Sequence, residues 1–555
     1  MKIKERLSVD VLVVGSGIAG LKTSMELSKD GHKVLMATKT QLCSGSSFYP
    51  LKASLGTQVT KDNDDKNVFL QDIEDVSHNM HDREMAKIYV EEIACRVNEY
   101  EEIGIQPTKL SDDRKACFAK HGRKIYMLKD WNKIRENVKE ILLDHPNIIV
   151  MERSVVISLI KKNGKIAGAF LLDKEDNLIL IQCKAVILAS GGFGNIYKHN
   201  LNPNDVDGSG HILALEAGAS LINMEFIQFI PGFTTPKYKT LFGEHTLTYC
   251  KDFVDGEGNS ILERFLPDGV SKQECLAVRS THGPFTNSLV SKYFDIAMMK
   301  EIINTKSEAG FELVYNKDIY EDKRDFYSIY LNWLNERGIN LLKDKVKIAP
   351  FAHASNGGVK IDSFGRAGVE GLYAVGELAG GIEGANRLGG NSTGACMVFG
   401  KRTAEDCSEY VKQSDYLDID EQGEIDKLNK QVACFSTGVH ESLTPNEIMD
   451  AIRDIMWYHG NIIRNEENLS SAIKKIDELH YSFNMSFYFT KDGEPKSAFK
   501  ARNFLLLSKL LLMAMLERKE SRGAHYREDY PQEDVRFNKR LFISLEDHET
   551  KLKFQ

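Results

Sequence analysis

Short apolar runs alternate with helical stretches at the start of the chain. Residues 11–14 read VLVV, a β-branched run typical of a buried parallel strand. The run ends in the glycine-rich residues 15–20, after which the apolar positions follow helical spacing. A second apolar run at residues 33–37 predicts another strand. The pattern therefore predicts a strand–helix–strand unit at the N-terminus.

The same junction of an apolar strand with glycines occurs twice more. Residues 185–189 (AVILA) lead into SGGFG, and residues 371–377 read GLYAVGE. In a doubly wound sheet, ligands lie at the carboxyl ends of the strands. Three such junctions therefore predict one crevice and a cofactor longer than a single mononucleotide.

The remaining stretches differ in their pattern. We expect mostly helix over residues 62–145, a small antiparallel meander over 147–182, and helices from 416 to about 520 followed by a polar tail. Residues 215–345 have mixed periodicity, many aromatic residues and charged helical stretches. This segment is predicted to be an inserted domain that caps the crevice.

Composition excludes several classes of protein. The net charge of −8 gives no reason to expect nucleic acid or an acidic membrane surface as a partner. There is no apolar run of about 18 residues, so no membrane span is expected, and the first apolar run is already a strand rather than part of a signal peptide. The nine cysteines include no C-x-x-C, which argues against an internal iron–sulfur cluster or metal site and favours free thiols in the cytoplasm.

The glycines at residues 15–20 form a G-x-G-x-x-G between strand and helix, the context that a dinucleotide site requires. Gly15 permits the tight turn, Gly17 lets the backbone approach a pyrophosphate, and Gly20 lets helix and strand pack closely. The second strand ends in Thr38-Lys39 instead of Asp or Glu. Either the ribose is held differently or the ligand is not NAD.

Seven motifs coincide with one family. They are VLVVGSGIAGL, VILASGGFGNIY with the following NP and DGSG, EAGASLINMEFIQF, DGEGNSILERF, APFAHASNGGVKIDSFGRAGVEGLYAVGE, GANRLGGNS and ESRGAHYREDYP. In these motifs the chain resembles the flavoprotein of succinate dehydrogenase and fumarate reductase, and its relative L-aspartate oxidase. The resemblance covers almost the whole chain in the family's order, and the family commonly has Ser-Lys where this chain has Thr38-Lys39.

The resemblance implies an α/β fold with a Rossmann-like FAD-binding domain, an inserted α+β capping domain and a C-terminal helical domain. We expect the FAD-binding domain at 1–215 and 346–415, the capping domain at 216–345, and the helical domain and tail at 416–555. The implied chemistry is hydride transfer between flavin N5 and a small carboxylate, with proton transfer at the neighbouring carbon.

The resemblance also implies how FAD is held. The respiratory enzymes bind FAD covalently through a His in a loop matching residues 44–56, but this loop has Ser46 and Ser47 and no His, so noncovalent FAD is expected. Pro50-Leu51-Lys52 in this loop departs from the family's A-Q-G-G. The remaining expected contacts are Gly15, Ser16, Gly17, Ala19 and Gly20 at the pyrophosphate, Thr38, Lys39 and Val155 at the adenosine, Ala189, Gly191 and Gly192 at the second junction, Glu377 at a ribose or ribityl hydroxyl, and Arg387, Asn391, Ser392 and Thr393 near the flavin.

Half of the family's dicarboxylate site is present. His353 falls on the substrate-binding His and Arg387 on the Arg that grips a carboxylate. The family's Q-F-H-P-T instead reads Gln228-Phe229-Ile230-Pro231-Gly232, which replaces a carboxylate-binding His by Ile.

The other functional positions depart further. The Thr-Glu pair of the family's L-I-T-E is placed near Lys251, and the proton-shuttle Arg aligns with Asn287. Arg279, His282 and His245 are candidates to replace the missing groups.

We therefore predict a FAD-dependent oxidoreductase whose small anionic substrate presents one carboxylate to His353 and Arg387, for example a monocarboxylate enoate, rather than fumarate. One alternative is amine oxidation like that of L-aspartate oxidase, with Lys251, Asn287 or Arg279 supplying the missing contacts. Another is a flavoprotein that relays electrons to or from an iron–sulfur partner, including a sulfur-oxyanion reductase of the adenylylsulfate reductase type. A non-catalytic flavin-binding scaffold is the third.

Overall fold

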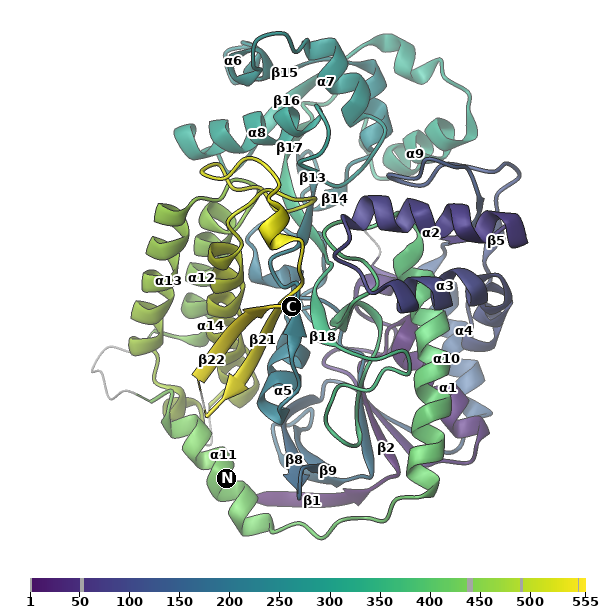
Figure 1. The fold of residues 1–555 in the computed structure, drawn as a ribbon, viewed down its shortest axis with the longest axis vertical. Coiled ribbons are helices and arrows are strands. Elements are labelled where there is room, and N and C mark those ends of the chain that lie inside the picture. The colour runs from purple at the N-terminus through teal and green to yellow at the C-terminus, as the bar shows by residue number, and fades with distance from the viewer. Residues whose placement is uncertain (1, 50–53, 437–442, 490–492, 548) are drawn as a thin grey trace.

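The computed structural model describes residues 2–49, 54–436, 443–489, 493–547 and 549–555. Pro50, Leu51 and Lys52, whose departure from the family pattern is noted above, lie outside the described residues. Figure 1 shows the arrangement of the elements along the chain.

The central sheet is parallel, with the order β19-β11-β2-β3-β7. Four of its strands are short and fully buried, as is typical of a parallel sheet: β2 (Val11–Val14), β3 (Val34–Ala37), β11 (Ala185–Leu188) and β19 (Leu372–Ala374). The edge strand β7 (Ile148–Met151) is partly exposed. Helix α1 (Ile18–Lys29) packs against the long helix α10 (Asn391–Lys412). The three strands that end in glycines are neighbours in this sheet, so their carboxyl ends open on one crevice.

A second sheet, β1-β10-β9-β8, lies beside the central one. Its strands are β1 (Ile3–Ser8), β8 (Val155–Lys162), β9 (Lys165–Leu172) and β10 (Leu178–Gln182). The predicted meander is correct for β8, β9 and β10, but its first strand is split. Residues 148–151 instead pair with β3 in the central sheet, because the chain turns at Arg153, where φ is +52°.

The stretch 62–145 is less helical than expected. It holds helices α2 (Asn63–Ser77), α3 (Arg83–Arg96) and α4 (Trp131–Leu143), and also the strands β5 (Thr108–Lys109) and β6 (Lys124–Leu128). These two strands form a three-stranded sheet with β4 (Leu55–Val59), which precedes the stretch.

A distal unit occupies the top of Figure 1. We use this name for the sheet β14-β13-β17-β16-β15 and the helices α6 to α9. Their bounds are β13 (Ile227–Thr235), β14 (Thr240–Leu241), β15 (Cys250–Val254), β16 (Phe311–Tyr315), β17 (Lys347–Ser355), α6 (Ile261–Phe265), α7 (Lys272–Arg279), α8 (Lys292–Thr305) and α9 (Asp325–Glu336). The sequence predicts that the capping domain ends at residue 345. Strand β17 follows this boundary, yet it pairs with β13 and β16 of the distal unit.

The C-terminal part is helical, as predicted, up to residue 517. Its helices are α11 (Glu421–Ala433), α12 (Pro445–His459), α13 (Glu466–Tyr481) and α14 (Pro495–Glu517). The expected polar tail is wrong, because β21 (Leu541–Glu546) and β22 (Glu549–Phe554) form a hairpin. They complete the sheet β20-β18-β12-β21-β22 with β12 (Leu221–Ile222), β18 (Gly358–Lys360) and β20 (Ala379–Gly380).

Helix α5 (Ser209–Ala217) lies next to this last sheet. No described helix combines the length and the apolar character that crossing a membrane requires.

Candidate active site

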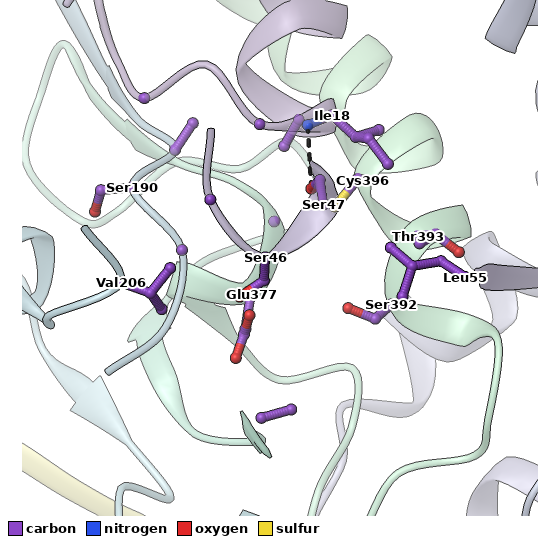
Figure 2. A pocket seen from close by; sticks show the side chains of 18 of the residues that line it. Ile18, Ser46, Ser47, Leu55, Ser190, Val206, Glu377, Ser392, Thr393 and Cys396 are labelled. Atoms are coloured by element: carbon purple, nitrogen blue, oxygen red, sulfur yellow. Dashed lines mark hydrogen bonds between the residues drawn. The ribbon is translucent and has the colours of Figure 1, made fainter. Parts of the chain in front are cut away.

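One pocket extends from the carboxyl ends of β2, β3 and β11 to the β13–β17 pair of the distal unit. Figure 2 shows Ser46, Glu377 and Ser392 directed toward the same space from three separate parts of the chain. Of the predicted site residues, the following line it: Gly15, Ser16, Gly17, Ala19, Thr38, Lys39, Ser46, Ser47, Ala189, Gly191, Gln228, Ile230, His353, Glu377, Arg387, Ser392 and Thr393.

The glycine loop at the start of α1 forms one end of the pocket. Gly15 has φ of +117°, and a Cβ there would meet the carbonyl oxygen of Ala189 at 2.3 Å. A Cβ on Gly20 would meet the Gly15 oxygen at 2.1 Å, so any larger residue would push the helix off the strand. Gly17 lies in the pocket wall, and the Ile18 N–H donates to Ser47 Oγ (3.4 Å; Figure 2). This open helix N-terminus suits a pyrophosphate.

The end beyond β3 suits the adenosine. Lys39 lines the pocket and forms an ion pair of 2.5 Å with the buried Asp207. Burial would raise the pKa of Asp207, but the charges of Lys39 and Lys500 hold it below its usual range. Ser154 and Val156 line the pocket here, whereas Val155, between them on β8, does not.

The middle of the pocket is lined by Glu377 and the first turn of α10. Glu377 Oε1 accepts hydrogen bonds from the backbone N–H (3.0 Å) and the hydroxyl (3.3 Å) of Ser355. Gly192 backs this pair instead of lining the pocket, since a Cβ there would meet Glu377 Oε1 at 2.4 Å. Asn391 is fully buried and faces away to Gln58, whose Nε2 donates to Asn391 Oδ1 (3.1 Å).

Ser46 is held by a hydrogen bond from its hydroxyl to Asn202 Oδ1 (2.6 Å). The glycine loop, the adenosine end and this middle section together offer an anion site, an ion-paired polar end and a polar wall. This donor set fits a flavin adenine dinucleotide.

The far end of the pocket brings together His353 from β17 and Arg387 from the GANRLGGN loop. Arg387 Nη2 lies 3.4 Å from His353 Nε2. A guanidinium has only donors, so a hydrogen bond between the two side chains can be accepted only by Nε2. Both side chains line the pocket, which lets one carboxylate bridge them.

The rest of this end of the pocket is mostly apolar, with one acid. Ile230, Leu241 and Pro284 line it together with Glu244 and Cys117. Cys117 Sγ lies 3.7 Å from Glu244 Oε1, and burial raises the pKa of Glu244 above its ordinary value. Burial also raises the pKa of the Cys117 thiol, to about 12, so the sulfur is protonated and can donate to the carboxyl.

Glu244 is an acidic residue of the pocket that sequence reasoning missed. Lys251, near which the sequence predicts the family's L-I-T-E pair, is exposed on β15 and does not line the pocket. The same Leu-x-x-Glu spacing occurs at Leu241 and Glu244, which do line it.

The predicted replacements for the missing groups do not reach the pocket. Arg279 is fully buried and bound to Asp295 through Nε (2.8 Å) and Nη2 (3.1 Å), with its other donors on the carbonyl oxygens of His282 and Gly283. His282 has both ring nitrogens in hydrogen bonds of 2.8 Å, to Pro284 O and to Ser291 Oγ, and burial lowers its pKa to about 3.

Three other predicted residues also lie outside the pocket wall. His245 sits among the rings of α9, and burial lowers its pKa to about 3. Asn287 is bound instead to the C-terminal segment, its backbone N–H donating to Gly523 O (2.8 Å). Phe229 is buried against Tyr197, with ring centroids 5.2 Å apart. None of these residues contacts the space beside Arg387.

Comparisons with known proteins agree with this geometry. Residues 10–393 match the FAD binding domain family, and residues 449–555 match the fumarate reductase flavoprotein C-term family. The chain is 26% identical over 562 residues to one subunit of the fumarate reductase (CoM/CoB) of Methanothermobacter marburgensis, covering 97% of this chain and 98% of that protein. It is 28% identical over 549 residues to L-aspartate oxidase of Yersinia pestis, covering 94% and 96%.

A solved structure is similar over the same length. Mycobacterium smegmatis Sdh1 in complex with UQ1 matches with a TM-score of 0.83 and 26% identity, covering 99% of this chain and 95% of that chain. The chain therefore belongs to the succinate dehydrogenase and fumarate reductase flavoprotein family of FAD-dependent oxidoreductases, and FAD is its cofactor.

Proposed function

We propose that this enzyme interconverts a small monocarboxylate and the corresponding enoate. The observation that carries the proposal is the asymmetry of the substrate end of the pocket. Among the described residues that line the pocket, Lys39 and Arg387 are the only Lys or Arg side chains, and Lys39 is paired with Asp207 at the adenosine end. One carboxylate therefore has a cationic partner at the substrate end.

A second carboxylate would be placed badly. The other side chains at this end of the pocket include Ile230, Leu241 and Glu244, none of which is a cation. Burying an unpaired carboxylate costs several kcal/mol, and an ionised Glu244 would add repulsion. The pocket thus favours a substrate with one anionic end and one apolar end.

The residues of the chain have separate tasks in this proposal. FAD, when bound, supplies the hydride exchange with one carbon of the substrate. Arg387 and His353 hold the carboxylate and fix the position of the neighbouring carbons. Glu244, with its raised pKa, holds a proton at its carboxyl oxygen for the adjacent carbon. The distal unit acts as the cap that brings Ile230, Leu241 and Glu244 over the substrate.

Glu244 also supports a second candidate, oxidation of an amine to an imine. A pocket that holds both Arg387 and an ionised Glu244 suits a substrate with one carboxylate and one ammonium group. The relative from Yersinia pestis is an L-aspartate oxidase. Aspartate itself brings a second carboxylate, for which the wall around Ile230 has no partner, so we rank this candidate second.

The test is anaerobic. Acid precipitation of the purified protein should release the yellow colour, because the loop 44–56 has no His to hold FAD covalently. The photoreduced protein is then mixed with fumarate, with a panel of monocarboxylate enoates, and with imines of small amino acids generated in place. We expect reoxidation by an enoate, and rapid reoxidation by fumarate would refute the proposal.

The other outcomes separate the alternatives. Reoxidation by an imine alone would favour amine oxidation. Reoxidation by no substrate would favour electron relay through a separate iron–sulfur protein. That role is consistent with the name of the Methanothermobacter marburgensis relative, which is one subunit of its enzyme. A cytoplasmic location stays a prediction.

A further inference from the structure

Asn386, the residue before Arg387, joins three parts of the chain. Its side chain is buried, with 1% of its surface exposed. Asn386 Nδ2 donates to Phe285 O (3.1 Å), while Oδ1 accepts from Gln228 Nε2 (2.6 Å) and from the backbone N–H of Arg387 (2.9 Å). These partners fix the orientation of the amide. The carbonyl oxygen of Phe285 requires the NH2 group of Asn386, and the two N–H groups require its oxygen.

The partners of Asn386 belong to the distal unit and to the carboxylate site. Gln228 is on β13 and lines the pocket. Phe285 follows directly after Gly283 and Pro284, which also line it. The backbone N–H of Phe285 donates to Phe229 O (2.8 Å), so this segment is already fastened to β13. Asn386 thus links the loop of Arg387 to the pocket wall of the distal unit, in addition to the contact of Arg387 with His353.

We propose that Asn386 is a positioning residue that sets Arg387 and the wall segment 283–287 relative to each other. Docking of the distal unit over the pocket and placement of the guanidinium then depend on the same amide. The effect on substrate rests on the proposed role of Arg387, whereas the link to residues 283–287 does not.

Asn386→Asp breaks the link selectively. An aspartate keeps an acceptor for Gln228 and for the Arg387 N–H, but it loses the donor and sets a carboxylate oxygen against Phe285 O. The matched control is Asn223→Asp, because Asn223 is equally buried and its Nδ2 donates to Met80 O (2.9 Å) away from the pocket. Asn386→Ser, which is too short to reach Phe285, is the second variant if Asn386→Asp does not fold.

The first measurement is hydrogen exchange of the FAD-loaded protein over residues 283–290. We expect the amides of Phe285 and Asn287 to exchange about tenfold faster in Asn386→Asp, because the segment loses the protection of one hydrogen bond. Their exchange should be unchanged in the Asn223→Asp control. Unchanged exchange in both Asn386 variants would overturn the proposal.

The second measurement is the Kd for crotonate, read from the flavin absorbance. We expect about tenfold weaker binding in Asn386→Asp, and no further loss when Arg387→Ala is already present, because residues that act through one another are not additive. Losses that multiply in the double variant would overturn the positioning role. If the wild-type protein binds no carboxylate, the proposed function fails, and the exchange experiment alone decides the link.

Discussion

Replacing Ile230 by His tests the substrate class most directly. Ile230 is 5% exposed and lines the same pocket as Arg387 and His353, on the strand β13 that pairs with the strand of His353. We expect a dicarboxylate held by that pair to bring its second carboxylate within reach of this side chain, because Ile230 lies on the strand next to that of His353. In Ile230→His, an imidazolium there can donate a charge-assisted hydrogen bond to it.

The size of the effect follows from two contributions. A hydrogen bond to a charged group contributes about 1.5–3 kcal/mol, which corresponds to roughly 10- to 150-fold in kcat/KM for fumarate. The apolar end of a monocarboxylate loses contact with about one methylene, or about 0.8 kcal/mol, roughly fourfold. The ratio of kcat/KM for fumarate to that for crotonate should therefore rise roughly 40- to 600-fold.

The assay is stopped-flow reoxidation of the photoreduced protein at pH 6 and pH 8. The gain should be larger at pH 6, since an ordinary His has a pKa of about 6.5. Ile230→Leu is the matched control, because it conserves volume and adds no donor. The reasoning is refuted if the wild-type protein already prefers fumarate, or if Ile230→His changes the ratio no more than Ile230→Leu does.

Three further predictions concern charged residues. Arg387→Lys keeps the charge but loses the planar fork, so the KM for a monocarboxylate should rise roughly 10- to 100-fold, and an unchanged KM would contradict a bidentate grip. Burial raises the pKa of Glu383 to about 7, with Arg387 opposing and Glu377 adding to the shift. The ionised carboxylate competes for Arg387, so monocarboxylate affinity should fall as the pH rises through about 7, and this step should vanish in Glu383→Gln; a wild-type Kd that is constant from pH 6 to 8 would argue against it. Arg279→Met leaves Asp295 buried without its partner, so the free energy of unfolding measured in urea should fall by about 3–5 kcal/mol while the kcat of the folded enzyme is kept. A lower kcat without a loss of stability would instead indicate that Arg279 takes part in catalysis.

The parts of the fold that sequence reasoning predicted are those with a local pattern. The VLVV run and its glycines identify β2 and the start of α1 without any knowledge of distant residues. The hairpin of β21 and β22 was missed although Leu541, Ile543 and Leu545 alternate with polar residues, because a charged sequence at a chain end reads as a tail. The break at Arg153 inside an apolar stretch depends on a positive φ that nothing local demands.

The site divides in the same way. His353 and Arg387 lie in motifs that identify them wherever they occur, and the structure brings them together. Arg279 and His282 looked equally suited to catalysis, but their partners are Asp295 and Ser291, which only the folded chain places beside them. The Leu-x-x-Glu spacing around Glu244 is too short to be recognised as a motif in the sequence. Its match to the family's L-I-T-E becomes visible only because Leu241 and Glu244 both line the pocket.

The hairpin at the C-terminus affects how the protein is made. Leu221 of β12 pairs with Ile543 of β21, about 320 residues later in the chain. Ribosomes add about 5–20 residues per second, so β12 waits roughly 16–64 s for its partner strand to be synthesised. During that interval an apolar strand edge is open to other chains. This sheet is therefore expected to close only once residues 541–546 have been synthesised, and a chain truncated before residue 541 should leave this edge of β12 unpaired and should aggregate more readily.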